Sequence, residues 1–128
     1  MTTRVTKGIQ ITVRTEYQPA HSQPQNGYYL FSYYITIENK SDMEVKLLRR
    51  HWNIFDSNGE YRQVDGEGVI GEQPTLQPGE AYEYESACNL NTDMGKMDGT
   101  YLMERVVDKL QFYVTIPAFE MVVPLRLN

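Results

Sequence analysis

Cysteine is almost absent from this chain of 128 residues, which contains only Cys88. A single cysteine excludes an internal disulfide framework, the usual substitute for a large core in small secreted domains. No histidine or basic residue is adjacent to Cys88 in the sequence. We therefore interpret Cys88 as a small buried hydrophobic residue and not as a reactive thiol.

Long apolar runs are missing as well. No segment approaches the ~20 apolar residues that a membrane-spanning helix needs. The first seven residues also lack the apolar segment of a secretory signal peptide. We expect a protein with no membrane span and a cytoplasmic location.

Positive charge is scarce over much of the chain. The net charge is −5, and residues 56–104 contain eleven acidic side chains but only two basic ones, Arg62 and Lys96. Nucleic-acid binding needs a basic contact surface, so nucleic acid is excluded as an expected partner.

The usual catalytic and metal-binding patterns are absent too. Ser86 has no G-x-S-x-G context, no histidine is near Cys88, and no H-x-H or C-x-x-C spacing occurs. Loop acids such as Asp65 and Asp98 could bind a hard divalent cation only if folding brings them together. We expect no enzyme and no cofactor, and the sequence leaves the identity of any metal unknown.

Tyrosine, by contrast, is abundant, with ten residues, and apolar side chains alternate with period two. This alternation indicates half-buried strands. Turn signals recur roughly every ten residues, which is typical of a sandwich. The expected fold is all-β: an immunoglobulin or fibronectin type III-like sandwich of seven to eight antiparallel strands. Strands are expected at residues 9–14, 28–39, 45–56, 80–86, 100–107, 110–116 and 119–127. One more strand is expected after residue 60, where it would form a hairpin with the 45–56 strand.

Several local features carry specific predictions. A change of parity between Leu47 and Trp52 indicates a bulge near residues 49–50, and Asn58-Gly59 predicts a tight primed hairpin turn. Trp52 is expected in the core. Residues 91–99 are expected to form a loop, residues 103–110 are the best helical candidate, and Pro124 indicates an edge strand.

Gly66, Gly68 and Gly71 have the spacing G-x-G-x-x-G of a dinucleotide-binding loop. That loop needs a following helix, whereas Pro74 comes next and the neighbouring acids repel phosphate. The simplest interpretation is a glycine-rich bend between strands. The alternative is a backbone nest that binds phosphate or a nucleotide together with a divalent cation, with Arg62 as the nearest base.

Four segments, residues 52–56, 66–80, 82–86 and 97–103, resemble the ApaG family of bacterial proteins. The resemblance extends from about Val5 to Leu127, and Ala87 and Asp93 depart from the residues usual in the family. It implies one ApaG-like domain over residues 1–128 with a fibronectin type III-like fold. It also implies a link to cobalt resistance and magnesium homeostasis, which a chain without a membrane span would serve only indirectly.

Similar domains in eukaryotic F-box proteins and in a polymerase-interacting protein look like protein-binding modules, and nucleotide binding has been suggested for the family from its glycine motif. The sandwich pattern, the abundant tyrosine, the uneven charge and the absence of a catalytic set also favour a non-enzymatic protein-interaction module with an unidentified protein partner, which is the expected function. Phosphate or nucleotide binding at Gly66, Gly68, Gly71 and Arg62 is the alternative. Homo-oligomerisation is left open.

Overall fold

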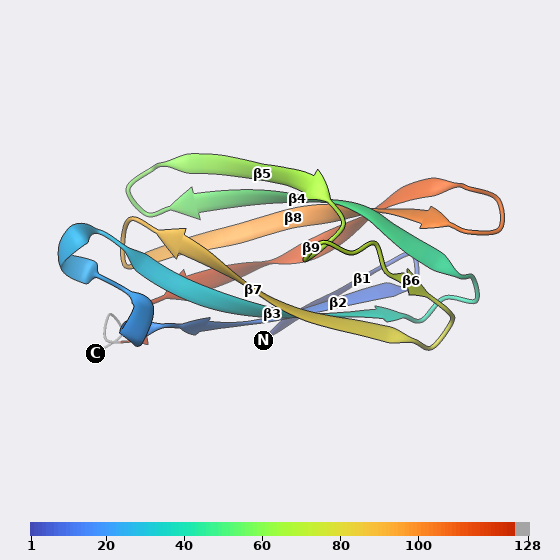
Figure 1. The fold of residues 1–128 in the computed structure, drawn as a ribbon, viewed down its shortest axis with the longest axis horizontal. Coiled ribbons are helices and arrows are strands. Elements are labelled where there is room, and N and C mark those ends of the chain that lie inside the picture. The colour runs from blue at the N-terminus through green and yellow to red at the C-terminus, as the bar shows by residue number, and fades with distance from the viewer. Residues whose placement is uncertain (125–128) are drawn as a thin grey trace.

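A computed structural model describes residues 1–124, which form two antiparallel sheets packed face to face (Figure 1). The first sheet has the order β1-β2-β3-β7, and the second has the order β5-β4-β8-β9, with β6 paired to the start of β4. The strands are β1 (Thr2–Thr6), β2 (Ile9–Tyr17), β3 (Tyr29–Asn39), β4 (Val45–Asp56), β5 (Tyr61–Glu67), β6 (Thr75–Leu76), β7 (Ala81–Leu90), β8 (Met94–Arg105) and β9 (Gln111–Val122). Two short 3-10 segments, η1 (Pro19–His21) and η2 (Pro24–Asn26), connect β2 to β3. The predicted all-β sandwich is confirmed.

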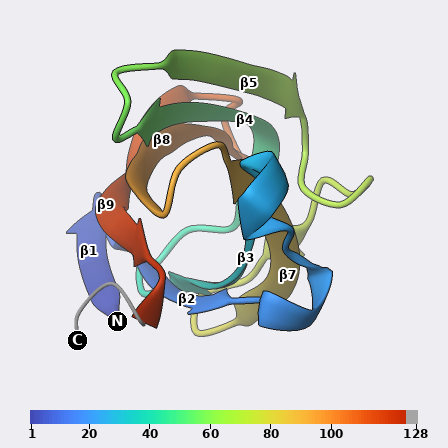
Figure 2. The same ribbon diagram turned by 90° about the vertical axis from the view of Figure 1, so that its left-hand side faces the viewer.

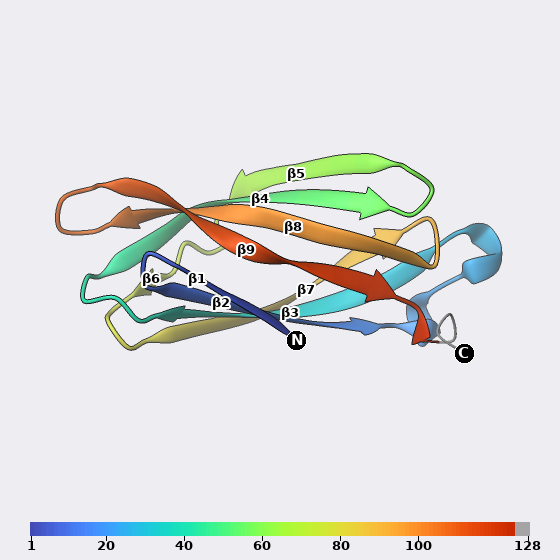
Figure 3. The same ribbon diagram turned by 180° about the vertical axis from the view of Figure 1, so that it is seen from behind.

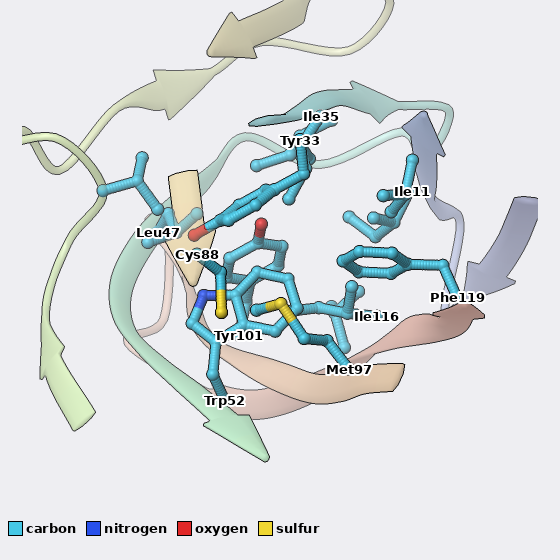
Figure 4. Close-up of a cluster of buried hydrophobic side chains, with 14 of the residues drawn as sticks. Ile11, Tyr33, Ile35, Leu47, Trp52, Cys88, Met97, Tyr101, Ile116 and Phe119 are labelled. Atoms are coloured by element: carbon cyan, nitrogen blue, oxygen red, sulfur yellow. The ribbon is translucent and has the colours of Figure 1, made fainter. Parts of the chain in front are cut away.

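The core lies between the sheets and follows the predicted alternation. Trp52 of β4 packs edge-on against Tyr33 of β3, with ring centroids 5.3 Å apart, and against Phe119 of β9 at 6.0 Å (Figure 4). Trp52 is 2% exposed, so the prediction of a core tryptophan is confirmed. Burial of these large aromatic rings supplies much of the hydrophobic stabilisation that holds the two sheets together.

Residues 1–124 contain nine strands, more than the seven or eight expected. The first additional strand, β1, has no buried residue, so it lacks the alternating apolar pattern that identifies a strand in a sequence. The second, β6, has only two residues. Among these residues no helix is long and apolar enough to cross a membrane.

The region after β7 differs from the prediction. Residues 94–99 of the predicted loop belong to β8. Residues 103–105 continue β8 and a turn follows, so residues 103–110 do not form the expected helix. The predicted loop contains Gly95 and Gly99, where a side chain would collide with a carbonyl oxygen of β4, at Phe55 and at His51 respectively. These glycines therefore mark close approach of two strands, although in the sequence they look like turn residues.

The last two predicted strands are a single strand, β9, which lies at a sheet edge. Pro117 is tolerated inside it because it lies within a bulge of β9. The β8–β9 register shifts between Met97 and Gly99, so Pro117 and Ala118 together oppose Asp98. Pro124 follows β9 and is not part of it, and residues 125–127 of the predicted strand lie outside the described part of the chain.

A bulge in β4 determines which side chains face the interior. The β4–β8 register shifts between Leu47 and Arg49, which confirms the predicted bulge and moves it by one residue to Leu48. The hairpin after β4 is also present, but its turn has a three-residue loop in which only Gly59 has positive φ, at 90°. It is therefore a turn with a glycine bulge and not the primed two-residue turn that was expected.

The two lateral sides of the sandwich differ. On one side β1 and β2 lie against β9, and the amide of Thr115 donates to Thr6 Oγ1 at 3.3 Å (Figures 2 and 3). On the other side the edge strands are β5 and β7. The groove described next lies between these two strands.

Candidate binding groove

A groove of about 360 Å³ separates β5 from β7. Its floor consists of core side chains, chiefly Tyr33, Trp52 and Met97, and Arg50 and Arg62 supply its charge. We call it the arginine groove, and its full lining is Tyr33, Arg50, Trp52, Ile54, Arg62, Val64, Ser86, Ala87, Cys88, Asn89 and Met97. A pocket of this size with an apolar floor and a few polar groups has the general character of a ligand site.

Arg50 faces inward because of the β4 bulge. It pairs with Gly66 of β5 on one side and with the buried Tyr101 of β8 on the other. Arg50 Nη1 donates to the carbonyl oxygens of Glu67 at 3.1 Å and Gly68 at 3.0 Å. A Cβ at position 66 would lie 2.6 Å from this nitrogen, so the absence of a side chain at Gly66 makes room for the guanidinium group.

Arg62 reaches across the groove from β5 to β7. Its Nη2 donates to the carbonyl oxygen of Asn89 and lies 3.3 Å from Cys88 Sγ. Within residues 1–124, neither Arg62 nor Arg50 has a carboxylate partner within 4.0 Å. Two guanidinium groups therefore line one groove, and no acidic side chain of residues 1–124 forms an ion pair with either.

The floor contains a hydrogen-bond donor that is not used. Among the residues described, Trp52 Nε1 is buried and has no partner, and Figure 4 shows the nitrogen on the edge of the indole towards Cys88. An unsatisfied buried donor costs about 1–3 kcal/mol, so such groups are uncommon in folded proteins.

Two other floor residues have raised pKa values. Burial raises the pKa of the Cys88 thiol, although the hydrogen bond from Arg62 acts in the opposite direction. Burial likewise raises the pKa of Tyr33, again against a hydrogen bond, here with Ser86. Cys88 is therefore a buried thiol of low reactivity, as interpreted from the sequence.

The predicted ligand residues are only partly brought together. Arg62 and Gly66 are both on β5, and the carbonyl of Gly68 binds Arg50 at the end of the groove. Gly71 lies instead in a tight turn, residues 69–72, in which Ile70 and Gly71 have φ values of 48° and 74°.

Backbone carbonyls already accept from several amides of this block. Gly68 N donates to Leu48 O at 2.9 Å, Val69 N donates to Glu72 O at 2.8 Å, and Glu72 N donates to Val69 O at 3.0 Å. No helix follows the block, which leads through β6 into β7. Phosphate or nucleotide binding there stays a prediction.

The outer face of the second sheet carries a second polar cluster that sequence reasoning missed. His51 Nδ1 lies 3.0 Å from Asp65 Oδ1, and His51 Nε2 lies 3.0 Å from Asn53 Oδ1. Asn53 Nδ2 in turn donates to Asp98 Oδ1 at 2.8 Å. The acids Asp65 and Asp98 thus have separate partners, and residues 1–124 contain no group of three or more His, Cys, Asp or Glu side chains that could hold a metal ion.

The available sequence signals explain what was missed. The sequence pointed only to Arg62 as a base near the glycine block, because the position of Arg50 near Gly66 depends on the pairing of β4 with β5. The bulge was the one usable signal, since a shift of one residue exchanges the inward and outward faces of a strand.

Comparison with known proteins identifies the family. A family model described as the ApaG domain matches residues 19–105. Proteins called ApaG from Anaeromyxobacter dehalogenans (strain 2CP-C) and Brucella canis are 48% and 44% identical to this chain, over 128 and 124 residues. The alignments cover 100% of both chains in the first case, and 97% of this chain and 95% of the relative in the second.

A solved structure is also similar. The crystal structure of a protein from Bordetella pertussis named as a putative ApaA protein superimposes with a TM-score of 0.88 at 36% identity. The superposition covers 91% of this chain and 94% of the other. The chain belongs to the ApaG family.

Proposed function

We propose that this chain is a non-enzymatic protein-interaction module that holds a segment of a cytoplasmic partner protein in the arginine groove. One observation carries the proposal. The groove lies along the edge strand β7 and contains two guanidinium groups, of Arg50 and Arg62, with no carboxylate partner in residues 1–124.

The composition of the groove supports binding to a protein. Arginine is one of the residue types that contribute most to protein–protein affinity, and the groove has two, Arg50 and Arg62, whereas its floor residues Trp52 and Tyr33 are only 2% and 6% exposed. The groove also offers no activated nucleophile, since burial raises the pKa of Cys88. Binding without catalysis is the function that these features favour.

Phosphate or nucleotide binding is the second candidate, because an anion would satisfy the same arginines. The glycine block gives it less support, since the amides of Gly68, Val69 and Glu72 are already bonded.

If the chain is a protein-interaction module, a role in cobalt resistance or magnesium homeostasis would be indirect, through the partner protein.

Affinity capture from the cells that produce the protein tests the proposal. The unaltered chain is compared with Arg62→Glu, which reverses the charge in the groove, and with Arg49→Glu, which makes the same change on the outer face. We expect a reproducible partner with the unaltered chain and with Arg49→Glu, and its loss with Arg62→Glu. Equal recovery by all three proteins would contradict the proposal, and recovery of the chain itself as the partner would identify a homo-oligomer.

A further inference from the structure

We infer that the segment bound in the arginine groove is an extended strand that adds to the free edge of β7 and places an acidic side chain between Arg50 and Arg62. This inference rests on the proposed function and specifies the chemistry of the partner. Three independent features of the groove support it: the exposed edge of β7, the distribution of charge on its two faces and the state of Trp52.

The first feature is the backbone of β7. Four consecutive residues, 86–89, line the groove, although alternate side chains of a strand point to opposite faces. Consecutive residues can line the same groove only if the strand presents its edge to it. The carbonyl of Asn89 accepts from Arg62 and so is directed away from β3.

The direction of the Asn89 carbonyl shows which other backbone groups of β7 face its free edge. In an antiparallel pair, alternate residues direct their N–H and C=O groups to the same side. The backbone groups of Ala87 and Glu85 therefore point towards the free edge, as those of Asn89 do. An incoming strand can pair with them, as in other peptide complexes formed by strand addition.

The second feature is charge. A strand added to β7 would direct every second side chain into the groove, towards Arg50 and Arg62, which lack carboxylate partners in the described chain. Its other side chains would lie beside Glu83 and Glu85 on the outer face of the first sheet. Opposite charges favour neighbouring positions on adjacent strands. The groove therefore fits a strand with an acidic residue on its inward face and basic residues on its outward face.

The third feature is Trp52. Its indole N–H is a buried donor without a partner in residues 1–124, on the floor of the same groove. A carboxylate bound by Arg50 and Arg62 would bring an oxygen that can accept a hydrogen bond to the groove whose floor contains this indole N–H. Trp52 is also the one tryptophan of the chain, so the tryptophan fluorescence and the indole N–H resonance come from a single residue on the floor of the groove.

The experiment uses the full chain and three synthetic peptides. The first alternates valine with lysine and has one central glutamate at an inward position. The second replaces that glutamate with glutamine. The third keeps the glutamate but is N-methylated along the edge that would pair with β7. Binding is followed by the indole ¹H–¹⁵N resonance of Trp52 and by the amide resonances of Glu85 and Ala87, with inorganic phosphate and acetate titrated separately.

We expect the glutamate peptide to shift the Trp52, Glu85 and Ala87 resonances. The glutamine and N-methylated peptides should bind at least about tenfold more weakly, because a charge-assisted pair and the edge hydrogen bonds are lost. Arg62→Gln should weaken the glutamate peptide similarly, whereas Arg49→Gln on the opposite face of β4 should leave its affinity unchanged. Arg50→Gln is a second test, because it leaves Arg62 and its contacts in place. It should also weaken binding of the glutamate peptide.

Equal affinity for the glutamate and glutamine peptides would overturn the inference, as would equal affinity for the N-methylated peptide. Tighter binding of phosphate than of the glutamate peptide would overturn it in favour of a small-anion site. If no peptide binds while Arg62→Glu still abolishes capture of a cellular partner, the acidic strand is wrong and the protein-interaction function stands. If capture also fails to depend on Arg62, the proposed function is wrong as well.

Discussion

At the scale of single residues, His51 is held in a position that favours its charged form. The Asp65 carboxylate, 3.0 Å from Nδ1, raises the pKa of His51 above its ordinary value of 6.5, and partial desolvation opposes this shift. Asn53 presents its amide oxygen to Nε2, because its nitrogen donates to Asp98. Both ring nitrogens therefore face acceptors and both donate in the imidazolium form.

The raised pKa has a definite consequence for stability. The contact of protonated His51 with Asp65 adds to the free energy of unfolding. This stabilisation is fully present below pH 6.5, the ordinary pKa of histidine, and is lost as the pH rises through the higher pKa of His51 in the folded state. Asp65→Asn should lower the pKa of His51 in an NMR titration and should flatten the pH dependence of the free energy of unfolding in that range. An unchanged His51 pKa in the variant would show that Asp65 does not stabilise the protonated form of His51.

Gly68 is a second residue with a specific prediction. It has φ of 61°, and a side chain there would collide with the carbonyl oxygen of Glu72. Gly68→Ala should reduce the free energy of unfolding by about 3 kcal/mol in a urea titration, since strain and a steric clash add. Gly71→Ala is the control. Gly71 also has positive φ, at 74°, but open space around it, so its loss should be about 1 kcal/mol.

Similar losses for the two alanine variants would contradict this account of the turn. The comparison also bears on ligand binding, because loss of binding in Gly68→Ala alone would reflect a deformed turn and not a missing contact. Arg62→Gln is the better probe of the groove, since Arg62 is exposed and lies on an edge strand.

The glycines and arginines show how far residue-level prediction extends. The simplest interpretation of the glycine block, a bend between strands, matches the backbone at Gly68 and Gly71, whereas Gly66 lies within strand β5. Arg50 could not be assigned to the groove from the sequence. Its inward direction depends on the single extra residue at Leu48, and strand pairing is a long-range property that local patterns do not specify.

At the scale of elements, Asn39 fixes the end of β3 to two other segments. Its Nδ2 donates to Met43 O at 2.8 Å and to Leu76 O at 2.9 Å, and its Oδ1 accepts from the amide of Ser41 at 3.0 Å. Asn39 is completely buried, so these groups have no alternative access to water. The side chain therefore joins β3, the turn before β4 and the short strand β6.

Asn39→Ala should lower the free energy of unfolding by about 2–4 kcal/mol, because buried carbonyl groups lose their donor. Asn58→Ala, in the exposed turn after β4, removes a local contact with Glu60 and should cost less than about 1 kcal/mol. Chemical denaturation of both variants gives the comparison. Equal losses would mean that Asn39 contributes no more than an ordinary turn residue.

Prediction of elements succeeded where alternation was strong and failed where other constraints decided. β3 and β4 were located almost to the residue because large apolar side chains repeat along them. The first half of β8 was predicted as a loop, because Gly95 and Gly99 are needed for close strand approach and not for a turn. The strand β1 gave no signal, because its residues are paired but not buried.

At the scale of the whole molecule, a pair of hydroxyl groups links the two sheets through the core. Tyr84 of β7 and Tyr101 of β8 are hydrogen-bonded to each other. Burial raises the pKa of both side chains, so the pair stays protonated well into the alkaline range. The bond connects the sheet that carries β7 with the sheet that carries β5.

A double-mutant cycle tests this link. Tyr101→Phe alone should cost about 1–3 kcal/mol of unfolding free energy, since the hydroxyl of the partly buried Tyr84 loses its partner. The double variant with Tyr84→Phe should be less destabilised than the sum of the single variants, with a coupling of at least about 0.5 kcal/mol. Strict additivity would show that the two hydroxyls do not stabilise each other.

The central claim is that the opening between β5 and β7 is the binding surface of the molecule. Hydrogen–deuterium exchange of the chain, alone and with its captured partner, tests it most directly, because strand addition protects backbone amides at the edge that it covers. We predict added protection at residues 85–89 of β7 and little change around Tyr113 on the outer face of β9. Protection centred on Tyr113 and His51, with residues 85–89 unaffected, would contradict the account and assign binding to the outer face of the second sheet.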